Sequence, residues 1–518
     1  MGGNMGDAQV NYAFVRIPGA EGETELTDSF VLTAWNDWKL PTINFTLEET
    51  TTVTVGVQIT GAGGGWGDTD DWNLCKTLDD PIPGLLEEVA ALNPLDYTGA
   101  SWAALEAAVE AAETGEGTAE LLRYAIDNLE EKPTEMALGS DISAAARGDR
   151  SFPDQNGESR KLYDIITNDY GYNMVRLRTW TGNDDGSCGK NTIIAYAKLC
   201  ADAGLRIMID FHYADSWADP GKQPAPAAWN VTSDVSAAEA DRVAGLLYDY
   251  TYDWISSLVE AGVYPEWVQV GNEINGGMVW PLGHTTNMEN FIKLLQAGTA
   301  AVRDASPTTK IIIHRSSAEE TDNVLGFYQS LIDKGYTDFD VIGLSFYPYD
   351  MDPTYLLECV SNTFDGLYEQ FCKDTHREIM LVEIGSNYME GNGATYNQGY
   401  NMIINCIRKL QAIPDGKGTG CMYWEIENYE YTGSGSNRRP TVVWNAFTPG
   451  AQLINEVPVT GLALSATELE LQVNNAESLS VTYTPAKPDI TELTWTSSDP
   501  TVATVNGAGL VLAVGVGE

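Results

Sequence analysis

Positive charge is scarce in this sequence. Its 29 lysines and arginines stand against 74 aspartates and glutamates, which gives a formal net charge of −45 at pH 7. Nucleic acids and anionic membrane surfaces repel a chain of this charge, so we expect no nucleic-acid partner. Long apolar runs are also absent. No stretch approaches the ~20 apolar residues that a membrane-spanning helix needs, so we expect no membrane insertion.

Grouped metal ligands are missing as well. The seven cysteines stand at positions 75, 188, 200, 359, 372, 406 and 421, with no C-x-x-C pair and no cysteine–histidine cluster. We therefore predict no zinc site, and we expect most of these thiols to be buried, since several lie in apolar patterns. The first residues, MGGNM, lack the charged and then apolar segment of a signal peptide. That start is typical either of a cytosolic protein or of an internal fragment.

The 518 residues exceed one ordinary core, so several domains are expected. Residues 1–77 contain FVLTAW, TINFTL and TTVTVGVQI, whose alternation and β-branching predict strands. These strands are too few for a closed sandwich, which indicates a partial β-sandwich. Residues 78–133 are rich in Ala, Leu and Glu at helical spacing and predict a small helical spacer. Residues 457–518 return to a strand pattern and are expected to form a further, truncated β-module.

Between residues 134 and 456, apolar runs alternate with helical patterns. Eight strands that alternate with helices indicate an α/β fold of the (β/α)₈ barrel type. Continuous apolar strands also fit a parallel sheet that is buried on both faces. The eight runs are Met136–Ser140, Met174–Trp180, Leu205–Tyr213, Trp267–Asn272, Lys310–His314, Val341–Pro348, Ile379–Ile384 and Gly420–Trp424.

Polar or aromatic residues follow seven of these eight runs, at the strand ends where barrel enzymes place their active sites. Each residue taken singly has a plainer explanation. Asn272 and Glu273 could cap a helix, Arg176 could form a structural ion pair, and His212 could be a hydrogen-bonded core histidine. Helix caps do not explain so many at one rim. The candidate site residues are Arg176, Asp210, His212, Asp215, Trp217, Asn272, Glu273, His314, Tyr347, Glu383 and Trp424.

Two carboxylates stand out, Glu273 after the fourth predicted strand and Glu383 at the end of the seventh. Glycoside hydrolysis uses two carboxyl groups that flank the scissile bond, and a separation of ~5–5.5 Å makes one the nucleophile and the other the acid/base. Arg176 is suited to keep a carboxylate ionised, and Tyr347 to donate a hydrogen bond to it. Trp424 offers a floor for a sugar ring. We therefore interpret the rim as a glycosidase site.

Five stretches then resemble a known family: YNMVRLRTW, IMIDFHYADSWADPGKQPAPAAW, VQVGNEINGGMVWP, VIGLSFYPY and IMLVEIG. Together they are similar to glycoside hydrolase family 53, the arabinogalactan endo-β-1,4-galactanases of retaining clan A, over about 134–456. The resemblance implies Glu273 as acid/base, Glu383 as nucleophile and β-1,4-galactan or arabinogalactan as the substrate, with no required cofactor. It also implies substrate or support roles for Arg176, His212, Asn272, Tyr347 and Trp424.

Three loops depart from the family pattern: IGSNYMEGNGATYNQGY after Glu383, RSSAEETDN after His314, and EIENYEYTGSGSNRRPTVVWN after Trp424. They leave the number of sugar subsites and a structural calcium ion open. The flanks resemble modular secreted enzymes, since residues 459–518 are similar to a bacterial Ig-like (group 2) module and residues 1–77 to a carbohydrate-binding sandwich. We therefore expect a monomeric fragment of a secreted or cell-surface bacterial protein.

Two alternatives remain at this point. Another clan A activity, such as a mannanase, xylanase or cellulase, would use the same barrel and carboxylates, because a fold does not fix a substrate. From a different class, the chain could be a carbohydrate-binding protein with an inactive barrel. The presence of both Glu273 and Glu383 speaks against that reading. An assay of sugar release from several polysaccharides separates these alternatives.

Overall fold

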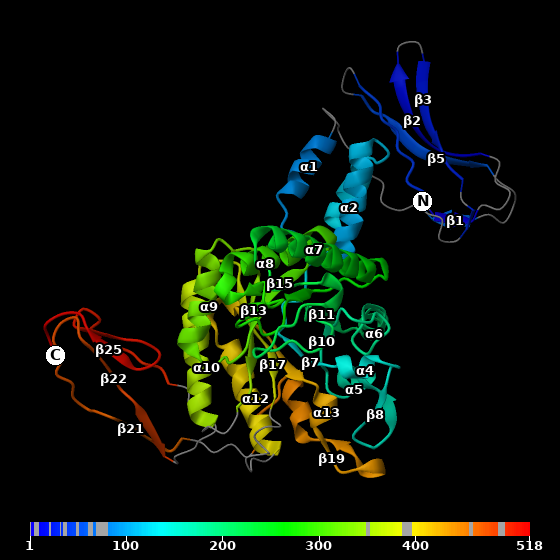
Figure 1. Ribbon diagram of the computed structural model, residues 1–518. Coiled ribbons are helices and arrows are strands. Elements are labelled where there is room, and N and C mark those ends of the chain that lie inside the picture. The colour runs from blue at the N-terminus through cyan, green and yellow to red at the C-terminus, as the bar shows by residue number, and fades with distance from the viewer. Residues whose placement is uncertain are drawn as a thin grey trace. The chain divides into compact units, whose positions relative to one another are not determined.

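The computed structural model describes residues 2–4, 10–19, 22–31, 33–34, 39–47, 51–60, 66–68, 81–348, 353–385, 396–454, 459–484 and 493–518. The chain divides into two compact units, Met1–Pro81 and Ile82–Glu518. Figure 1 draws the elements of both units.

The first unit contains two three-stranded antiparallel sheets, in the orders β4-β1-β6 and β3-β2-β5. Their strands are β1 (Gly2–Asn4), β2 (Val10–Gly19), β3 (Gly22–Ser29), β4 (Thr33–Ala34), β5 (Thr54–Thr60) and β6 (Trp66–Asp68). The strand predicted for TINFTL, residues 42–47, is wrong, because this segment forms no strand. Its first backbone amide, that of Thr42, donates to Oδ2 of Asp28 (2.7 Å) and not to a sheet carbonyl.

The second unit begins with three short helices, α1 (Ile82–Ala90), α2 (Gly99–Thr114) and α3 (Ala119–Asp127). Threonine side chains cap two of them, because Thr98 accepts a hydrogen bond from the amide of Ser101 and Thr118 from that of Leu121. The helices share a small apolar core of their own, made of Leu85, Trp102, Leu105, Ala112 and Leu122.

A closed barrel of eight parallel strands follows. Each apolar run predicted from the sequence forms one of these strands, so the (β/α)₈ fold is confirmed. In order around the barrel they are β10 (Met174–Thr179), β11 (Arg206–Phe211), β12 (Trp267–Val270), β15 (Lys310–Arg315), β16 (Val341–Phe346), β17 (Glu378–Ile384), β18 (Gly418–Trp424) and β7 (Ala137–Asp141).

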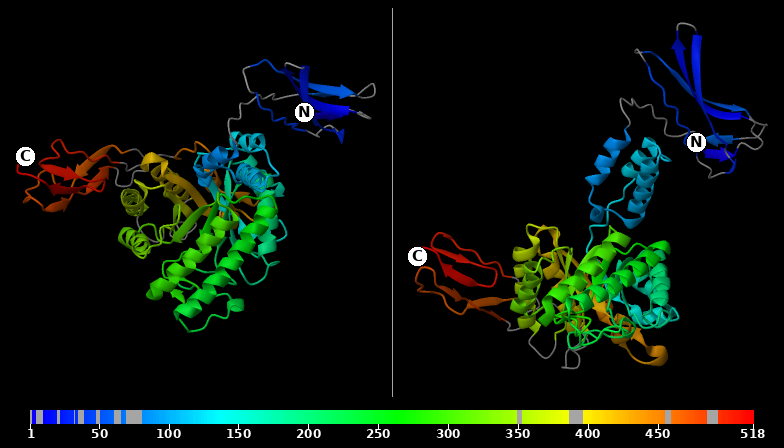
Figure 2. Two further views of the ribbon diagram at one scale, coloured as in Figure 1. Left: turned by 90° about the horizontal axis from the view of Figure 1, so that it is seen from above. Right: turned by 45° about the horizontal axis from the view of Figure 1, so that its top comes forward.

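Helices lie outside the strands, and α7 packs beside α8 on the outer surface of the barrel (Figure 1 and Figure 2). The helices of the barrel are α5 (Leu162–Asn168), α6 (Lys190–Asp202), α7 (Ala237–Glu260), α8 (Met288–Ala305), α9 (Thr321–Asp333), α10 (Pro353–Leu367) and α12 (Tyr396–Gln411). Short elements in the loops are α4 (Ser143–Ala146), α13 (Ile426–Tyr429), β8 (Ser151–Pro153), β9 (Ser159–Lys161), β13 (Gly277–Met278), β14 (Gly283–His284), β19 (Tyr431–Thr432) and β20 (Arg439–Pro440). Among the described helices, none combines the length and the apolar character that crossing a membrane requires.

The two-residue period of the strands sorts the barrel interior into layers. One buried apolar cluster draws a side chain from every strand: Ala137, Met174, Met208, Trp267, Ile312, Val341, Met380, Val382 and Met422. Two residues further along four of these strands, the inward positions are polar and buried: Arg176, Asp210, Gln269 and His314. The apolar layer therefore carries a polar layer on its C-terminal side, and the rim lies above that layer.

The last part of the chain is a small β-module. It contains a β21-β23 pair and a β22-β25-β24 sheet, both antiparallel. The strands are β21 (Gly461–Leu464), β22 (Ala476–Ser478), β23 (Val481–Thr484), β24 (Ala503–Val505) and β25 (Leu510–Ala513).

The apolar layer predicts a stability effect. Ile312, on β15, has no exposed surface, so Ile312→Ala should lower the free energy of unfolding by about 2–5 kcal/mol through lost burial and a residual cavity. Leu199→Ala on α6 is the control, because that side chain is 37% exposed and should cost far less. Urea unfolding followed by circular dichroism measures both variants. Equal losses would contradict a close-packed layer at Ile312.

Candidate active site

One buried guanidinium, that of Arg176, joins the polar layer to the rim. Arg176 is 1% exposed. Its Nη1 donates to Oδ2 of Asp141 (3.0 Å), and its Nη2 lies 2.9 Å from both Oδ2 of Asp210 and Oε1 of Glu383. Because a buried charge is costly unless it is paired, the arginine and these carboxylates stabilise one another.

Glu383, at the end of β17, is the carboxylate that this arginine reaches at the rim. The hydroxyl group of Tyr347 donates a hydrogen bond to Oε2 of Glu383 (2.9 Å). Burial raises the pKa of Glu383, whereas Arg176 and the Tyr347 hydroxyl act in the opposite direction because they stabilise the charged form. With both carboxylate oxygens contacted by donors, Glu383 is the member of the pair that ionises first.

Glu273 follows β12 with a left-handed backbone (φ 46°), a conformation that is strained for a residue with a side chain. Its Oε1 accepts a hydrogen bond from Oγ of Ser345 at 2.8 Å. Burial and the charge of Glu383 raise the pKa of Glu273 to about 8, against smaller opposing effects of Ser345 and Arg176. The two carboxyls therefore differ: a pKa of about 8 favours the protonated form of Glu273 at neutral pH, whereas Glu383 is the one in contact with an arginine, which stabilises a carboxylate. This is the division of labour that acid and nucleophile need.

The predicted polar residues beside them are bound within the protein. Oδ1 of Asn272 accepts from Nη2 of Arg176 (2.9 Å), and its Nδ2 donates to the carbonyl of Ala218 (2.8 Å). Nε2 of His212 lies 3.0 Å from Oδ2 of Asp210, and its Nδ1 accepts from the amide of Ala218 (3.0 Å). These contacts hold the loop at Ala218 against the polar layer.

An aromatic wall stands at the same rim. Trp424 stacks on Tyr429, with ring centroids 5.0 Å apart and planes at 25°, and meets Tyr347 edge-on at 6.3 Å. Trp217 is 37% exposed, lies 6.3 Å from Trp424 and carries the guanidinium of Arg178 4.3 Å above its ring. Exposed aromatic faces of this kind suit the apolar faces of sugar rings.

Asp215 stabilises the loop that contains Trp217. Its Oδ1 accepts from Oγ1 of Thr181 (2.7 Å) and its Oδ2 from the amide of Ala227 (2.9 Å). Both carboxylate oxygens are thus engaged by the protein. His314, in contrast, has no exposed surface. The structure therefore places His314 beneath the rim, whereas Asp215 is exposed in the loop that contains Trp217.

The chain matches known protein families. The family model described as Glycosyl hydrolase family 53 matches residues 137–448, more than half of the chain. The chain belongs to this family. A second family model, bacterial Ig-like domain (group 2), matches residues 458–518.

Relatives of this family 53 chain carry a common name. This chain is 34% identical over 249 residues to the "Arabinogalactan endo-beta-1,4-galactanase" of Thermothelomyces thermophilus, and the aligned region covers 47% of this chain and 71% of that protein. It is 28% identical over 340 residues to the protein of the same name from Humicola insolens, and that alignment covers 62% of this chain and 96% of the relative. A fungal β-1,4-galactanase structure matches with a TM-score of 0.52 and 27% identity over 60% of this chain and 98% of that one. The Ignisphaera aggregans GH53 catalytic domain gives the same TM-score and identity over 61% and 96%.

Five further residues in contact with the site were not among its predicted members: Asp141, Arg178, Gln269, Ser345 and Glu425. Asp141 binds both Arg176 and Arg178, and Arg178 also pairs with Glu425. A usable signal was the strand period, because Gln269 lies two residues beyond the apolar-layer residue Trp267. Polar residues at inward positions of an otherwise apolar strand must find partners inside the barrel.

Metal binding was left open by the sequence. Within the described ranges, no group of three or more His, Cys, Asp or Glu side chains is arranged to hold a metal ion. The loop after Trp424 begins with Glu425, which is paired with Arg178 and so does not suit a cation. Much of the loop after Glu383, residues 386–395, lies outside the described residues. The calcium expectation stays a prediction.

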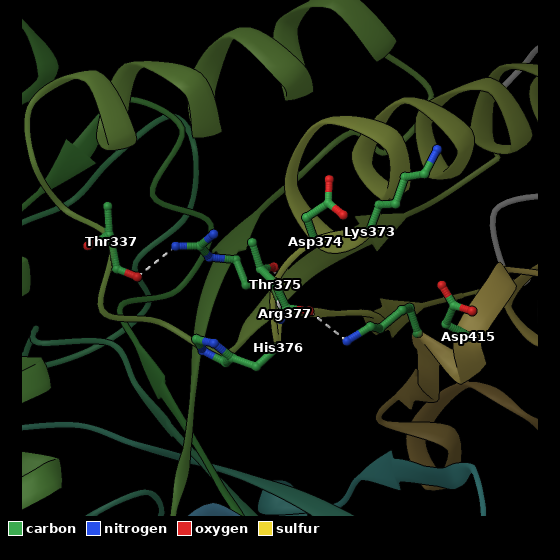
Figure 3. A pocket seen from close by; sticks show the side chains of 8 residues that line it. Thr337, Lys373, Asp374, Thr375, His376, Arg377 and Asp415 are labelled. Carbon is green, nitrogen blue, oxygen red and sulfur yellow. Dashed lines mark hydrogen bonds between the residues drawn. The ribbon is translucent and has the colours of Figure 1, made fainter.

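A separate hollow of about 740 Å³ lies at the opposite, N-terminal ends of strands β16, β17 and β18, and Thr337, Thr375, Arg377 and Lys417 are among the residues that line it. Figure 3 shows Arg377 reaching the carbonyl of Thr337, a hydrogen bond of 2.7 Å. Nζ of Lys417 donates to the carbonyl of Thr375 at 2.9 Å. None of the rim carboxylates lines this hollow, so it takes no part in the candidate site.

The contact between Tyr347 and Glu383 predicts a pH effect. Tyr347→Phe removes a donor that stabilises ionised Glu383, so the pKa of Glu383 should rise. Since activity is lost as pH falls through that pKa, the acidic limb of kcat/KM should move to higher pH. Turnover should fall about 10–100-fold, the effect of a hydrogen bond to a charged group.

The control is Tyr328→Phe, because Tyr328 is a buried tyrosine whose hydroxyl donates to the carbonyl of Ile313 (2.9 Å) and not to a carboxylate. It should leave the pH profile unchanged. An acidic limb that stays in place in Tyr347→Phe would show that the hydroxyl does not control the charge of Glu383.

Proposed function

We propose that this chain is a retaining endo-β-1,4-galactanase that cleaves galactan and type I arabinogalactan. The substrate is supported by membership of family 53 together with relatives named arabinogalactan endo-beta-1,4-galactanase. The reaction is supported by one observation above all, the contrast between Glu273, whose pKa is raised to about 8, and Glu383, which Arg176 pairs at 2.9 Å.

In the first step, a carboxylate oxygen of Glu383 attacks the anomeric carbon and the glycosidic C–O bond breaks. Glu273 gives its proton to the departing sugar oxygen, so that an alcohol leaves and not an alkoxide. The product is a galactosyl ester of Glu383. Tyr347 and Arg176, which contact the two oxygens of Glu383, orient it for this attack.

In the second step, Glu273 acts as a base. Once Glu383 is esterified its charge is gone, which removes one of the two main causes of the raised pKa of Glu273. Glu273 is then a carboxylate that takes a proton from water, and the resulting hydroxide attacks the anomeric carbon and releases Glu383. Two inversions give net retention.

The aromatic wall supplies the sugar contacts in this proposal. Trp424 is the floor beneath the ring that carries the cleaved bond, and Trp217 is the side wall. Oδ1 of Asn272 accepts a hydrogen bond from Arg176, and its Nδ2 donates one to the carbonyl of Ala218. Asn272 therefore orients both the arginine and the loop at Ala218, in addition to its proposed contact with a sugar hydroxyl.

The proposed division of labour places all chemistry in residues 134–456. Every residue assigned a role lies in that range, whereas residues 1–77, 78–133 and 457–518 contribute none. We propose that these flanks provide reach and surface retention, since tethering to an insoluble substrate raises its local concentration. A polysaccharide substrate also supports a location outside the cell, either secreted or at the cell surface.

The carboxylate roles are tested by two substitutions. Glu383→Ala and Glu273→Ala should each lower galactan turnover by several orders of magnitude with the fold intact. Azide should rescue Glu383→Ala and give an inverted product, because the small anion attacks from the opposite face. Glu273→Ala should keep activity on substrates with good leaving groups, which need no proton.

Glu378→Gln is the matched control, since this residue lies at the start of the same strand β17 and pairs with Lys310 (2.6 Å). It should retain normal turnover. Near-normal activity in either alanine variant would overturn the assignment. Sugar release from galactan, mannan, xylan and cellulose tests the substrate, and preferential release from any but galactan would favour another clan A activity.

A further inference from the structure

His314, at the end of β15, holds the segment of Glu273 at three points. Its Nδ1 accepts a hydrogen bond from the backbone amide of Glu273 (3.3 Å), and its carbonyl accepts one from the amide of Ile274 (3.0 Å). Its Nε2 lies 2.7 Å from Oγ of Ser345, and that hydroxyl donates to Oε1 of Glu273 at 2.8 Å. A closed ring of contacts thus runs from the backbone of Glu273 to its own carboxyl group.

The direction of the hydrogen bonds in this ring is fixed by groups that only donate. Nε of Arg176 donates to Oε1 of Gln269 (3.3 Å), which makes Nε2 of Gln269 the amino end of that amide. This amino group lies 2.9 Å from Nδ1 of His314, and the backbone amide of Glu273 points to the same nitrogen. Oδ1 of Asn272 also lies 3.1 Å from Nδ1, but that oxygen already accepts from Nη2 of Arg176, whereas the backbone amide of Glu273 can only donate. Nδ1 is therefore the acceptor of that amide and carries no proton.

His314 is also neutral. Burial lowers its pKa well below the usual range, and the nearby charge of Arg176 acts in the same direction. A neutral imidazole with an unprotonated Nδ1 carries its single proton on Nε2. Nε2 therefore donates to Oγ of Ser345, and the one hydroxyl proton of Ser345 is left for Oε1 of Glu273.

Because Oε1 of Glu273 accepts this hydrogen bond, it is the carbonyl oxygen when the carboxyl group is protonated. We propose that Ser345 and His314 are positioning residues that keep the acid proton of Glu273 on Oε2, the oxygen that faces the leaving group. The inference rests on the proposed function, because it gives the acid of that reaction its orientation. Neither residue contacts substrate, since both are fully buried. In the second step the same contact leaves the lone pairs of Oε2 for the incoming water.

Ser345→Ala tests the proposal with two readouts. The Ser345 hydroxyl lowers the pKa of Glu273, so its loss should raise that pKa. Because the reaction needs protonated Glu273 and fails as pH rises through its pKa, the basic limb of kcat/KM should move to higher pH. At the optimum, kcat/KM on galactan should fall about 3–10-fold, as for one lost hydrogen bond. On a dinitrophenyl β-galactobioside, whose leaving group needs no proton, kcat/KM should stay within twofold.

Ser306→Ala is the matched control. Ser306 is likewise buried, and its Oγ accepts from Oγ1 of Thr309 (2.8 Å) before β15 begins, at the other end of the barrel. It should change neither readout. If Ser345→Ala does not fold, Ser345→Cys, which keeps the bulk but is a weak donor, takes the same test.

A basic limb that stays in place or moves to lower pH, or an equal loss of kcat/KM on both substrates, would overturn the proposal. Failure of the proposed function would look different, because the unsubstituted protein would then not cleave galactan at all. In that case the shift of the basic limb on the glycan that it does cleave still decides the roles of Ser345 and His314.

Discussion

The guanidinium of Arg176 is the group on which the rest of the site depends. It pairs with Asp141 and Asp210 beneath the rim and with Glu383 at the rim. Removing it would leave Asp210 and Glu383 buried without an arginine partner, which costs several kcal/mol, whereas Asp141 would keep its contact with Arg178. Its Nε also fixes the orientation of the Gln269 amide and, through it, the tautomer of His314. One side chain thereby sets the charge of the nucleophile and the direction of the hydrogen bonds that reach the acid.

Charge balance explains why the two carboxyls behave differently. In this region four buried carboxylates face two buried guanidinium groups, so negative charge is already in excess before Glu273 is counted. These groups belong to Asp141, Asp210, Glu383 and Glu425, and to Arg176 and Arg178. A further negative charge on Glu273 would add to the excess in a region of low dielectric, and its pKa is raised accordingly. The proton remains on the carboxyl that no arginine contacts, which is the one that has to give it away.

The sequence predicted the barrel because each strand is a continuous apolar run, and it predicted the rim because polar residues end those runs. It could not show which of these residues reach the substrate, since that depends on contacts between strands. His314 was expected at the sugar, but it is enclosed by Gln269, Asn272 and Ser345. The segment 42–47 has strand-like residues but no partner strand, and pairing is a long-range property that a local pattern does not contain.

The central claim is that Glu383, the carboxylate held by Arg176, forms the covalent bond to the sugar. A 2-deoxy-2-fluoro-galactobiosyl fluoride slows both steps but retains a good leaving group, so the galactosyl ester should accumulate. Proteolysis and mass spectrometry should then place the added mass on the peptide that contains Glu383, with fragmentation locating it on that side chain. A label on Glu273, or an intact protein that turns over galactan but never gains the mass, would contradict the account.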